Sequence, residues 1–360
     1  MSNYDVIIIG AGPGGIFAAY ELAEKAPELK VAVFEAGNPL EKRKCPIDGK
    51  KIKNCINCKR CSIMCGFGGA GAFSDGKYNI TNDFGGTLYE HIGKSQAIKL
   101  MKYVDDINME YGGQGTKLYS TAGTKFKKLC LQNKLNLLDA SVRHLGTDIN
   151  YIVLENLYNA MKDHVDFYFD TPVQKLEILE DGYRVICEKG TYDCKKCIVS
   201  VGRSGSKWME TVCKDLNIPT KSNRVDIGVR VELPAVIFSH LTDELYESKI
   251  VYRTEKFEDN VRTFCMNPNG IVVNENTNGI ITVNGHSYEG IRLLICSSSS
   301  IINILYLLLI ILCFLHIQCK PHNSTAILQI LRRDLTTMCF YDRGTYRQPD
   351  PCIFLTAVKS

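Results

Sequence analysis

The sequence has no surplus of charge of either sign over most of its length. The formal net charge of the 360 residues is +4, and residues 291–360 hold seven basic and three acidic residues, which leaves 36 of each sign in the first 290. A protein that binds nucleic acid or an acidic polymer normally carries a basic stripe or patch. The neutral body therefore argues against a nucleic-acid or acidic-polymer partner.

A signal peptide is also missing. Residues 1–5 have neither the basic segment nor the longer apolar stretch of a secretory leader. We therefore expect a cytoplasmic protein. In that compartment the sixteen cysteines are expected to be thiols, metal ligands or redox groups and not structural disulfides.

No spacing of residues indicates a general acid, a general base or a nucleophile. The seven histidines are scattered along the chain, and His144 and His286 belong to motifs that are given below. We interpret both as hydrogen-bonded structural residues. The sequence therefore leaves the catalytic residues unknown.

What the sequence does contain is a nucleotide-binding βαβ pattern at residues 4–35. The apolar, β-branched run at 4–9 predicts a strand buried on both faces, residues 17–25 a helix and residues 31–34 a second strand. A glycine turn joins the first strand to the helix, at Gly10, Gly12, Gly14 and Gly15. The Gly10-x-Gly12-x-x-Gly15 spacing suits a tight turn, close approach of a pyrophosphate and close packing of helix on strand.

Two further features complete the predicted nucleotide site. The free N–H groups and the dipole at the start of the helix favour the phosphates. Glu35 lies twenty residues past Gly15, where a carboxylate accepts the hydrogen bonds of a ribose diol. Strand, turn, helix and acid are in register, which makes this fingerprint specific.

A second Gly-x-Gly-x-x-Gly occurs at residues 66–71, but no strand precedes it. We therefore do not interpret it as a second dinucleotide fold. An NAD(P)H electron donor, if one is used, would bind without a second Rossmann unit of this kind.

The rest of the first 205 residues predicts a mixed α/β pattern. Helical spacing of apolar residues occurs at 95–112 and 148–163, and residues 165–202 predict strands. The turns Asp181-Gly182 and Lys189-Gly190 divide this segment into a small antiparallel layer that returns to the main sheet.

A cysteine-rich loop follows Glu35. Its cysteines are Cys45, Cys55, Cys58, Cys61 and Cys65. The last four have the Cys-x2-Cys-x2-Cys-x3-Cys spacing of bacterial ferredoxins, and Cys45, which precedes a proline, is an alternative fourth ligand in place of Cys65. Zinc fits four thiolates equally well. An iron–sulfur cluster, zinc, a redox disulfide and a loop of reduced thiols all remain open.

Several stretches together carry a family resemblance. They are GAGPGG (10–15), the cysteine run with GFGGAGAFSDGK (66–77), RHLGTD (143–148), VGRSGSKW (201–208), VDIGVRVE (225–232), VRTFCMNPNG (261–270) and VNGHSYEG (283–290). Through them the chain resembles the uncharacterised FAD-dependent dehydrogenases, also called NAD(FAD)-utilising dehydrogenases, within the glutathione-reductase-like flavoproteins.

This resemblance implies a cofactor and its binding residues. The N-terminal unit would bind FAD and not NAD, with Glu35 on the adenosine ribose. The backbone of Val173 would contact the adenine, and residues 68–77 would lie along the flavin. The segment 199–205 would mark the crossing into a substrate domain.

We therefore predict an α/β protein with a Rossmann-like FAD-binding domain, built on a parallel sheet, at residues 1–205, with the cysteine loop 45–65 inserted. A mixed α+β substrate domain would follow at 206–290. The predicted function is that of an FAD-dependent oxidoreductase, a dehydrogenase acting on an unknown small molecule. The alternatives are a non-catalytic flavin-binding fragment and an iron–sulfur flavoprotein that passes electrons to a protein partner.

Residues 291–360 depart from this pattern, because no glutamate follows Glu289 and an apolar run occupies 301–317. The run is at the short limit for a transmembrane helix. Its flanking charges, Arg292 before it and Lys320, Arg332 and Arg333 after it, would place the FAD domain across the membrane, away from its cofactor. We therefore expect an atypical, aggregation-prone hydrophobic tail, with membrane association through 301–317 as the alternative.

Overall fold

The computed structural model describes residues 2–48, 50–52, 55–56, 58–221, 225–268, 270–277, 280–286, 299–304 and 353–359. The chain forms two compact units whose segments interleave in the sequence. Unit 1 comprises Met1–Gly76, Asp106–Gly115 and Leu145–Ser222, and unit 2 comprises Lys77–Asp105, Thr116–His144 and Asn223–Ser360. The domain boundaries drawn at 205 and 290 from the sequence stay predictions.

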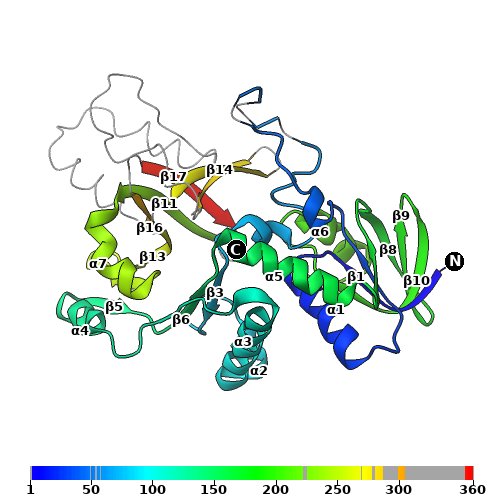
Figure 1. Cartoon of the computed structure of the whole chain (residues 1–360), viewed down its shortest axis with the longest axis horizontal. Coiled ribbons are helices and arrows are strands. Elements are labelled where there is room, and N and C mark those ends of the chain that lie inside the picture. Colours follow the sequence, from blue (N-terminus) through cyan, green and yellow to red (C-terminus); the bar gives the residue numbers. More distant parts are fainter. Residues whose placement is uncertain are drawn as a thin grey trace. The chain divides into compact units, whose positions relative to one another are not determined.

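A six-stranded sheet is the centre of unit 1, with the order β7-β2-β1-β10-β9-β8. Figure 1 labels four of these strands, β1, β8, β9 and β10. Its strands are β1 (Ser2–Ile9), β2 (Val31–Phe34), β7 (Val165–Tyr168), β8 (Val173–Leu179), β9 (Gly182–Cys187) and β10 (Gly190–Val199). β1 runs parallel to β2 and β10, and β2 runs parallel to β7. The predicted α/β fold with a parallel sheet is confirmed.

The remaining strands of this sheet are antiparallel. β8 pairs with β9 and β9 with β10, and β10 returns to lie beside β1. The predicted turns at 181–182 and 189–190 coincide with the ends of these strands. The antiparallel layer is therefore an extension of the main sheet, joined through β10.

Unit 1 has three α-helices in the described residues, and the sequence pattern predicts the first two but not the third. They are α1 (Pro13–Lys25), α5 (Gly146–Met161) and α6 (Ser206–Asp215), with 3₁₀ turns η1 (Leu40–Lys42) and η2 (Gly69–Phe73) and a π-helical turn η3 (Met109–Gly113). α1 starts four residues before the expected Phe17, because Pro13 fits the first helical turn, where its missing N–H costs nothing.

The core of unit 1 lies against both faces of β1 and β2. Ile7 and Ile8 are completely buried, and all of β2 is buried. Such two-sided burial is typical of a parallel strand covered by helices and explains the uninterrupted apolar runs of the sequence. α1 packs against α5 within this unit, and α6 contributes Val212 to the sheet's apolar cluster.

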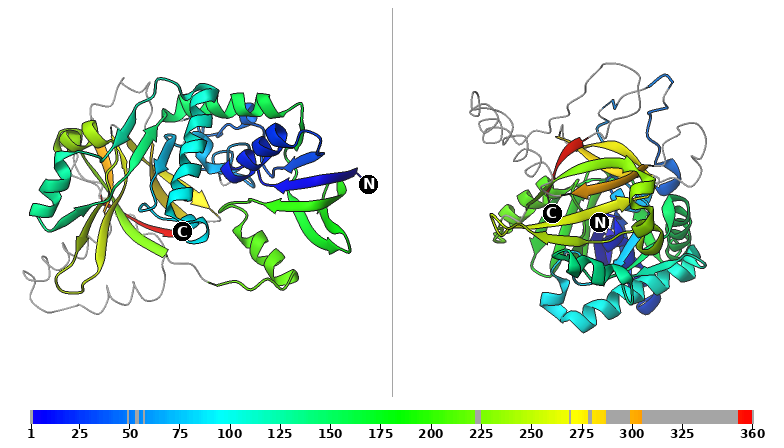
Figure 2. Two further views of the ribbon diagram at one scale, coloured as in Figure 1. Left: turned by 90° about the horizontal axis from the view of Figure 1, so that it is seen from below. Right: turned by 90° about the vertical axis from the view of Figure 1, so that its left-hand side faces the viewer.

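Unit 2 is mainly antiparallel. Its larger sheet has the order β17-β11-β16-β13-β12-β5, and two smaller sheets have the orders β14-β15 and β3-β6-β4. β16 (orange) and β17 (red) lie on either side of β11 (Figure 2). The predicted substrate domain, residues 206–290, overlaps this unit only in part, because residues 77–105 and 116–144 also belong to unit 2 and residues 206–222 belong to unit 1.

The elements of unit 2 come from three parts of the chain. The strands are β3 (Lys77–Ile80), β4 (Leu118–Ser120), β5 (Leu135–Leu137), β6 (Ser141–His144), β11 (Val225–Pro234), β12 (Ile250–Arg253), β13 (Asn260–Asn267), β14 (Ile271–Thr277), β15 (Ile280–His286), β16 (Ser299–Ile304) and β17 (Ile353–Lys359). The helices are α2 (Leu88–Ile92), α4 (Lys125–Gln132) and α7 (Ala235–Leu245), together with most of α3 (Lys94–Asn108).

The tail after residue 290 is described only in part. Its apolar run is described as far as Ile304, where it forms strand β16, and residues 305–317 lie outside the described part of the chain. In the residues that the structure describes, we find no helix with the length and apolar character needed to cross a membrane. The expectation of an aggregation-prone tail stays a prediction.

Candidate functional site

The glycine turn after β1 is closely packed on one side and open on the other. Gly10 has φ +100°, and a Cβ atom at Gly10 or Gly15 would collide with backbone carbonyl groups, those of Ser200 and Gly10 respectively. A Cβ at Gly12, by contrast, would have no atom within 4 Å. The turn therefore leaves space at the position where the sequence predicts the pyrophosphate.

The first turn of α1 faces this space without a capping group. Gly12 is the N-cap residue, no side chain caps the helix, and the first turn contains no acidic residue. The leading N–H groups and the helix dipole therefore favour an anion at this point. Gly14 lies in the same turn, where a Cβ atom would lie 2.6 Å from the Ser200 hydroxyl oxygen.

The second glycine run lies directly beside the first. The N–H of Gly68 donates to the carbonyl of Ala11 (2.8 Å). A Cβ atom at Gly69, where φ is +58°, would be 3.1 Å from the Cα of Gly12. Glycine is therefore needed here for a left-handed backbone and for close approach to the first turn. The run is not a second dinucleotide fold, and it forms one wall of the candidate site.

Glu35 has a structural role that the sequence analysis did not predict. Its side chain is 7% exposed. Oε2 accepts from the N–H of Ala11 (2.7 Å), and Oε1 accepts from Gly37 (2.8 Å) and Gly66 (3.0 Å). A carboxylate has about four acceptor sites, so one remains on Oε2 for a ribose hydroxyl. The ribose contact stays a prediction, whereas the joining of both glycine runs by Glu35 is observed.

We expect Glu35→Gln to lower both stability and cofactor affinity. The amide offers one acceptor oxygen and places an NH2 group against a backbone N–H, so one buried donor loses its partner at a cost of about 1–3 kcal/mol. Urea unfolding, monitored by circular dichroism, measures the loss, and Glu28→Gln, at an exposed turn position, is the matched control. Equal unfolding midpoints for the two variants would contradict this role of Glu35.

Arg43 holds the other end of the cysteine loop in place. Its buried guanidinium donates to the carbonyls of Ser62 (2.9 Å), Ile63 (2.8 Å) and Phe67 (2.6 Å). Burial lowers the pKa of Arg43 to about 10, and the nearby charge of Glu35 opposes this change. The arginine remains charged near neutral pH. Nothing in the basic stretch around Arg43 distinguished it in the sequence, because its three acceptors are backbone atoms.

The five cysteines of the loop do not form a metal site in the described structure. Cys55 and Cys58 are exposed, Cys45, Cys61 and Cys65 are half-buried, and all five are free thiols. Burial raises the pKa of Cys65, although a hydrogen bond with Ser204 opposes this. Within the described ranges no three His, Cys, Asp or Glu side chains are grouped to hold a metal ion. The predicted iron–sulfur or zinc site gains no support and stays a prediction.

Val173 begins β8, which is one of the two edge strands of the unit 1 sheet as described. It pairs with Cys187, and the pairing is irregular between Val173 and Lys175. An edge strand leaves backbone groups on one side for another partner. This position is compatible with a backbone contact to a ligand, and the adenine contact stays a prediction.

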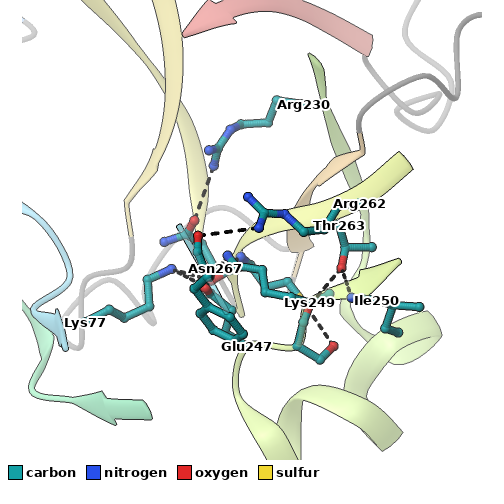
Figure 3. Close-up of polar contacts among 11 residues, drawn as sticks. Lys77, Arg230, Glu247, Lys249, Ile250, Arg262, Thr263 and Asn267 are labelled. Atoms are coloured by element: carbon teal, nitrogen blue, oxygen red, sulfur yellow. Dashed lines mark hydrogen bonds and ion pairs between the residues drawn. The ribbon is translucent and has the colours of Figure 1, made fainter. Parts of the chain in front are cut away.

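A buried network of charges lies in unit 2, around Glu247 (Figure 3). Glu247 is 2% exposed and accepts from the ammonium groups of Lys77 (2.7 Å) and Lys249. Burial alone raises the pKa of Glu247, but these two lysines lower it to about 2. The sequence did not predict this network, because Lys77 and Glu247 are 170 residues apart. Of Lys77, Glu247 and Lys249, only Lys77 belongs to one of the motifs named above.

Of the two histidines in family-like motifs, the structure describes the side chain of His144 but not that of His286. His144, in β6, stacks on Tyr246 with ring centroids 4.0 Å apart. Its Nε2 shares a 2.6 Å hydrogen bond with the Tyr246 hydroxyl group. This agrees with the interpretation of His144 as a hydrogen-bonded residue. The side chain of His286 lies outside the described residues.

Comparisons with known proteins give one broad and several local matches. A profile of the Thi4 family matches residues 1–39. A protein of Clostridium beijerinckii, described as an uncharacterized protein, is 25% identical over 293 residues, which are 79% of this chain and 48% of that protein. This chain thus spans about half the length of that relative. Thiamine thiazole synthase of Phaeosphaeria nodorum is 64% identical over 33 residues, 9% of this chain and 10% of that enzyme.

Solved structures give weak likenesses over most of the chain. Glycine oxidase from Geobacillus kaustophilus has a TM-score of 0.40 at 14% identity, covering 80% of this chain and 74% of the oxidase. NikD, an amino acid oxidase of nikkomycin biosynthesis, has a TM-score of 0.38 at 12% identity, covering 84% of this chain and 69% of NikD. These scores are low, and the likeness does not bear on function.

Proposed function

We propose that this chain is an FAD-dependent oxidoreductase, a dehydrogenase of the NAD(FAD)-utilising type, that acts on a small molecule. Unit 1 would bind the FAD. The observation that carries the proposal is the open space at Gly12 beside an uncapped helix N-terminus, with Glu35 at the end of the neighbouring strand. These are the groups that a dinucleotide requires at its pyrophosphate and ribose.

The residues fit this cofactor on physical grounds. A Cβ atom at position 12 would meet no atom within 4 Å, and the free N–H groups of α1 match a pyrophosphate in charge. The remaining acceptor site of Glu35 suits a ribose hydroxyl. In this proposal Gly68 and Gly69 hold a second backbone segment against the same turn, which keeps water away from one side of the bound phosphates.

FAD, when bound, supplies hydride transfer, and the protein binds and orients it. This is why the lack of a recognisable acid, base or nucleophile in the sequence does not argue against an enzyme. The electron donor is proposed to be NAD(P)H, bound without a second Rossmann unit.

The test is reconstitution of the purified full chain with FAD and, separately, with NAD. We expect FAD to be retained through desalting, with a visible flavin spectrum, and NAD not to be retained. The reconstituted protein should then reduce an artificial dye with NADH or NADPH. Retention of NAD and never of FAD would overturn the cofactor assignment.

The same experiment separates the two alternative functions. Retention of FAD with no reduction of the flavin by NAD(P)H would favour a non-catalytic flavin-binding protein. An iron–sulfur flavoprotein that serves a protein partner would require iron in the anaerobically purified protein. The described cysteines give that alternative no geometric support.

A further inference from the structure

Two cations of unit 2 contact the same aromatic ring. The ammonium nitrogen of Lys249 lies 4.7 Å from the ring centroid of Phe264, and the guanidinium carbon of Arg262 lies 5.0 Å from it. Lys249 is 3% exposed and also lies 5.0 Å from the ring of Phe84. Arg262 is half-buried. Lys249, Arg262 and the two phenyl rings thus form a positively charged cluster. Figure 3 shows Lys249 and Arg262 near Glu247.

The carboxylate of Glu247, which lies beside this cluster, is already ion-paired. Glu247 is shared between Lys77 and Lys249, so one carboxylate faces two ammonium groups. Arg262 donates to the carbonyl of Phe84 at 3.5 Å, a long and weak contact. Within the described residues, Arg262 forms no ion pair with a carboxylate.

Aromatic rings do not neutralise such charges. A cation–π contact contributes about 0.5–2 kcal/mol, but two cations close together in a poorly solvated site still repel each other. Buried or half-buried charges are normally compensated by a counter-charge. An anion at Arg262, a residue that is only half-buried, would supply it.

We propose that unit 2 binds the carboxylate of a small organic acid at Arg262, in the positive field of Lys249. The planar guanidinium matches a carboxylate with two parallel hydrogen bonds, and Phe84 and Phe264 provide an apolar surface for the rest of the molecule. Naming this acid as the substrate rests on the proposed function. The binding site itself rests on unit 2 alone.

The experiment is thermal unfolding of the full chain with benzoate, a small aromatic carboxylate, at constant ionic strength. The wild-type melting temperature should rise saturably with benzoate. In Arg262→Gln the apparent dissociation constant should increase about ten- to a hundredfold, as expected for a lost charge-assisted hydrogen-bond pair. Arg262→Lys, which keeps the charge but loses the fork, should lie between the two.

Arg253→Gln is the matched control. Arg253 is also in unit 2, but it is exposed and pairs with Glu258 at the surface, so benzoate binding should be unchanged. Circular dichroism confirms that each variant is folded. The proposal fails if benzoate gives no saturable shift, if Arg262→Gln and Arg253→Gln respond alike, or if inorganic phosphate gives the shift and benzoate does not.

FAD content, measured on the same samples, separates this inference from the proposed function. FAD retained without a benzoate response overturns the carboxylate site and leaves the flavoprotein assignment in place. A benzoate response that depends on Arg262, in a chain that never retains FAD, supports the site and overturns the proposed function.

Discussion

Replacement of Gly12 by valine is expected to abolish FAD retention while the protein stays folded. The backbone at Gly12 is extended (φ −76°, ψ −177°), a conformation that valine adopts without strain. The valine side chain would enter a space with no protein atom within 4 Å of its Cβ. It would therefore displace the cofactor's phosphates and not other side chains. We expect FAD affinity to fall about a hundredfold or more, a loss of about 3 kcal/mol.

The measurement is FAD titration followed by flavin fluorescence, with urea unfolding of the same samples without FAD. The loss of a favourable N-cap residue should lower the stability of the FAD-free protein by no more than about 1–2 kcal/mol. Normal FAD affinity in a folded Gly12→Val protein would show that the pyrophosphate binds elsewhere.

Gly15→Ala is an informative contrast in the same turn. Its Cβ would collide with the carbonyl oxygen of Gly10, so strand and helix must move apart, at a cost of about 1–3 kcal/mol. Gly12→Val should therefore mainly lower FAD affinity, whereas Gly15→Ala should mainly lower the free energy of unfolding.

The sequence was most informative where the interactions are local. β1, α1 and β2 follow one another within 34 residues, and their buried apolar runs, helical spacing and glycine turn appear directly in the letters. The same holds for β7 to β10, where two glycine turns separate short strands. Glu35 was placed correctly at the end of β2, because the length of a βαβ unit fixes it.

What the sequence could not predict depends on partners far apart in the chain. Glu35 bonds to Gly66, and Arg43 to the carbonyls of a loop some twenty residues later, and backbone acceptors leave no pattern in the sequence. The sequence also did not predict that the segments of unit 1 and unit 2 alternate along the chain. Residues 77–105 and 116–144 belong to unit 2, whose other residues all follow residue 222. Local periodicity predicts elements but not which unit they join.

The charge network of unit 2 shows the same limit for a site. The sequence gives no signal for a site at 246–249, a short and mostly polar stretch. In the structure all four of its residues are buried, because Lys77 reaches Glu247 from a strand 170 positions earlier. Burying a carboxylate and two ammonium groups costs desolvation free energy. Removing only the carboxylate also destabilises the fold, because it leaves buried ammonium groups without a counter-charge.

Glu247→Gln is therefore expected to be among the most destabilising single changes in the chain. The amide keeps the volume but leaves Lys77 and Lys249 buried without the negative charge that they share, at a cost of about 3–5 kcal/mol. Urea unfolding at neutral pH measures this. The matched control is Glu258→Gln, which breaks an exposed pair with Arg253 and should cost no more than about 1 kcal/mol.

The pH dependence of this destabilisation tests whether the charge of Glu247 causes it. The lysines lower the folded-state pKa of Glu247 from 4.5 to about 2, despite the opposing effect of burial. A depressed carboxylate pKa stabilises the folded state above the unfolded pKa and loses this contribution as the pH falls. The difference in unfolding free energy between wild type and Glu247→Gln should thus be constant above about pH 4.5 and shrink towards pH 2.

Adding Lys249→Met to Glu247→Gln should restore part of the stability, since it removes one uncompensated ammonium group. A difference that does not change with pH, together with a double variant that is no more stable than Glu247→Gln, would show that packing and not charge makes Glu247 important.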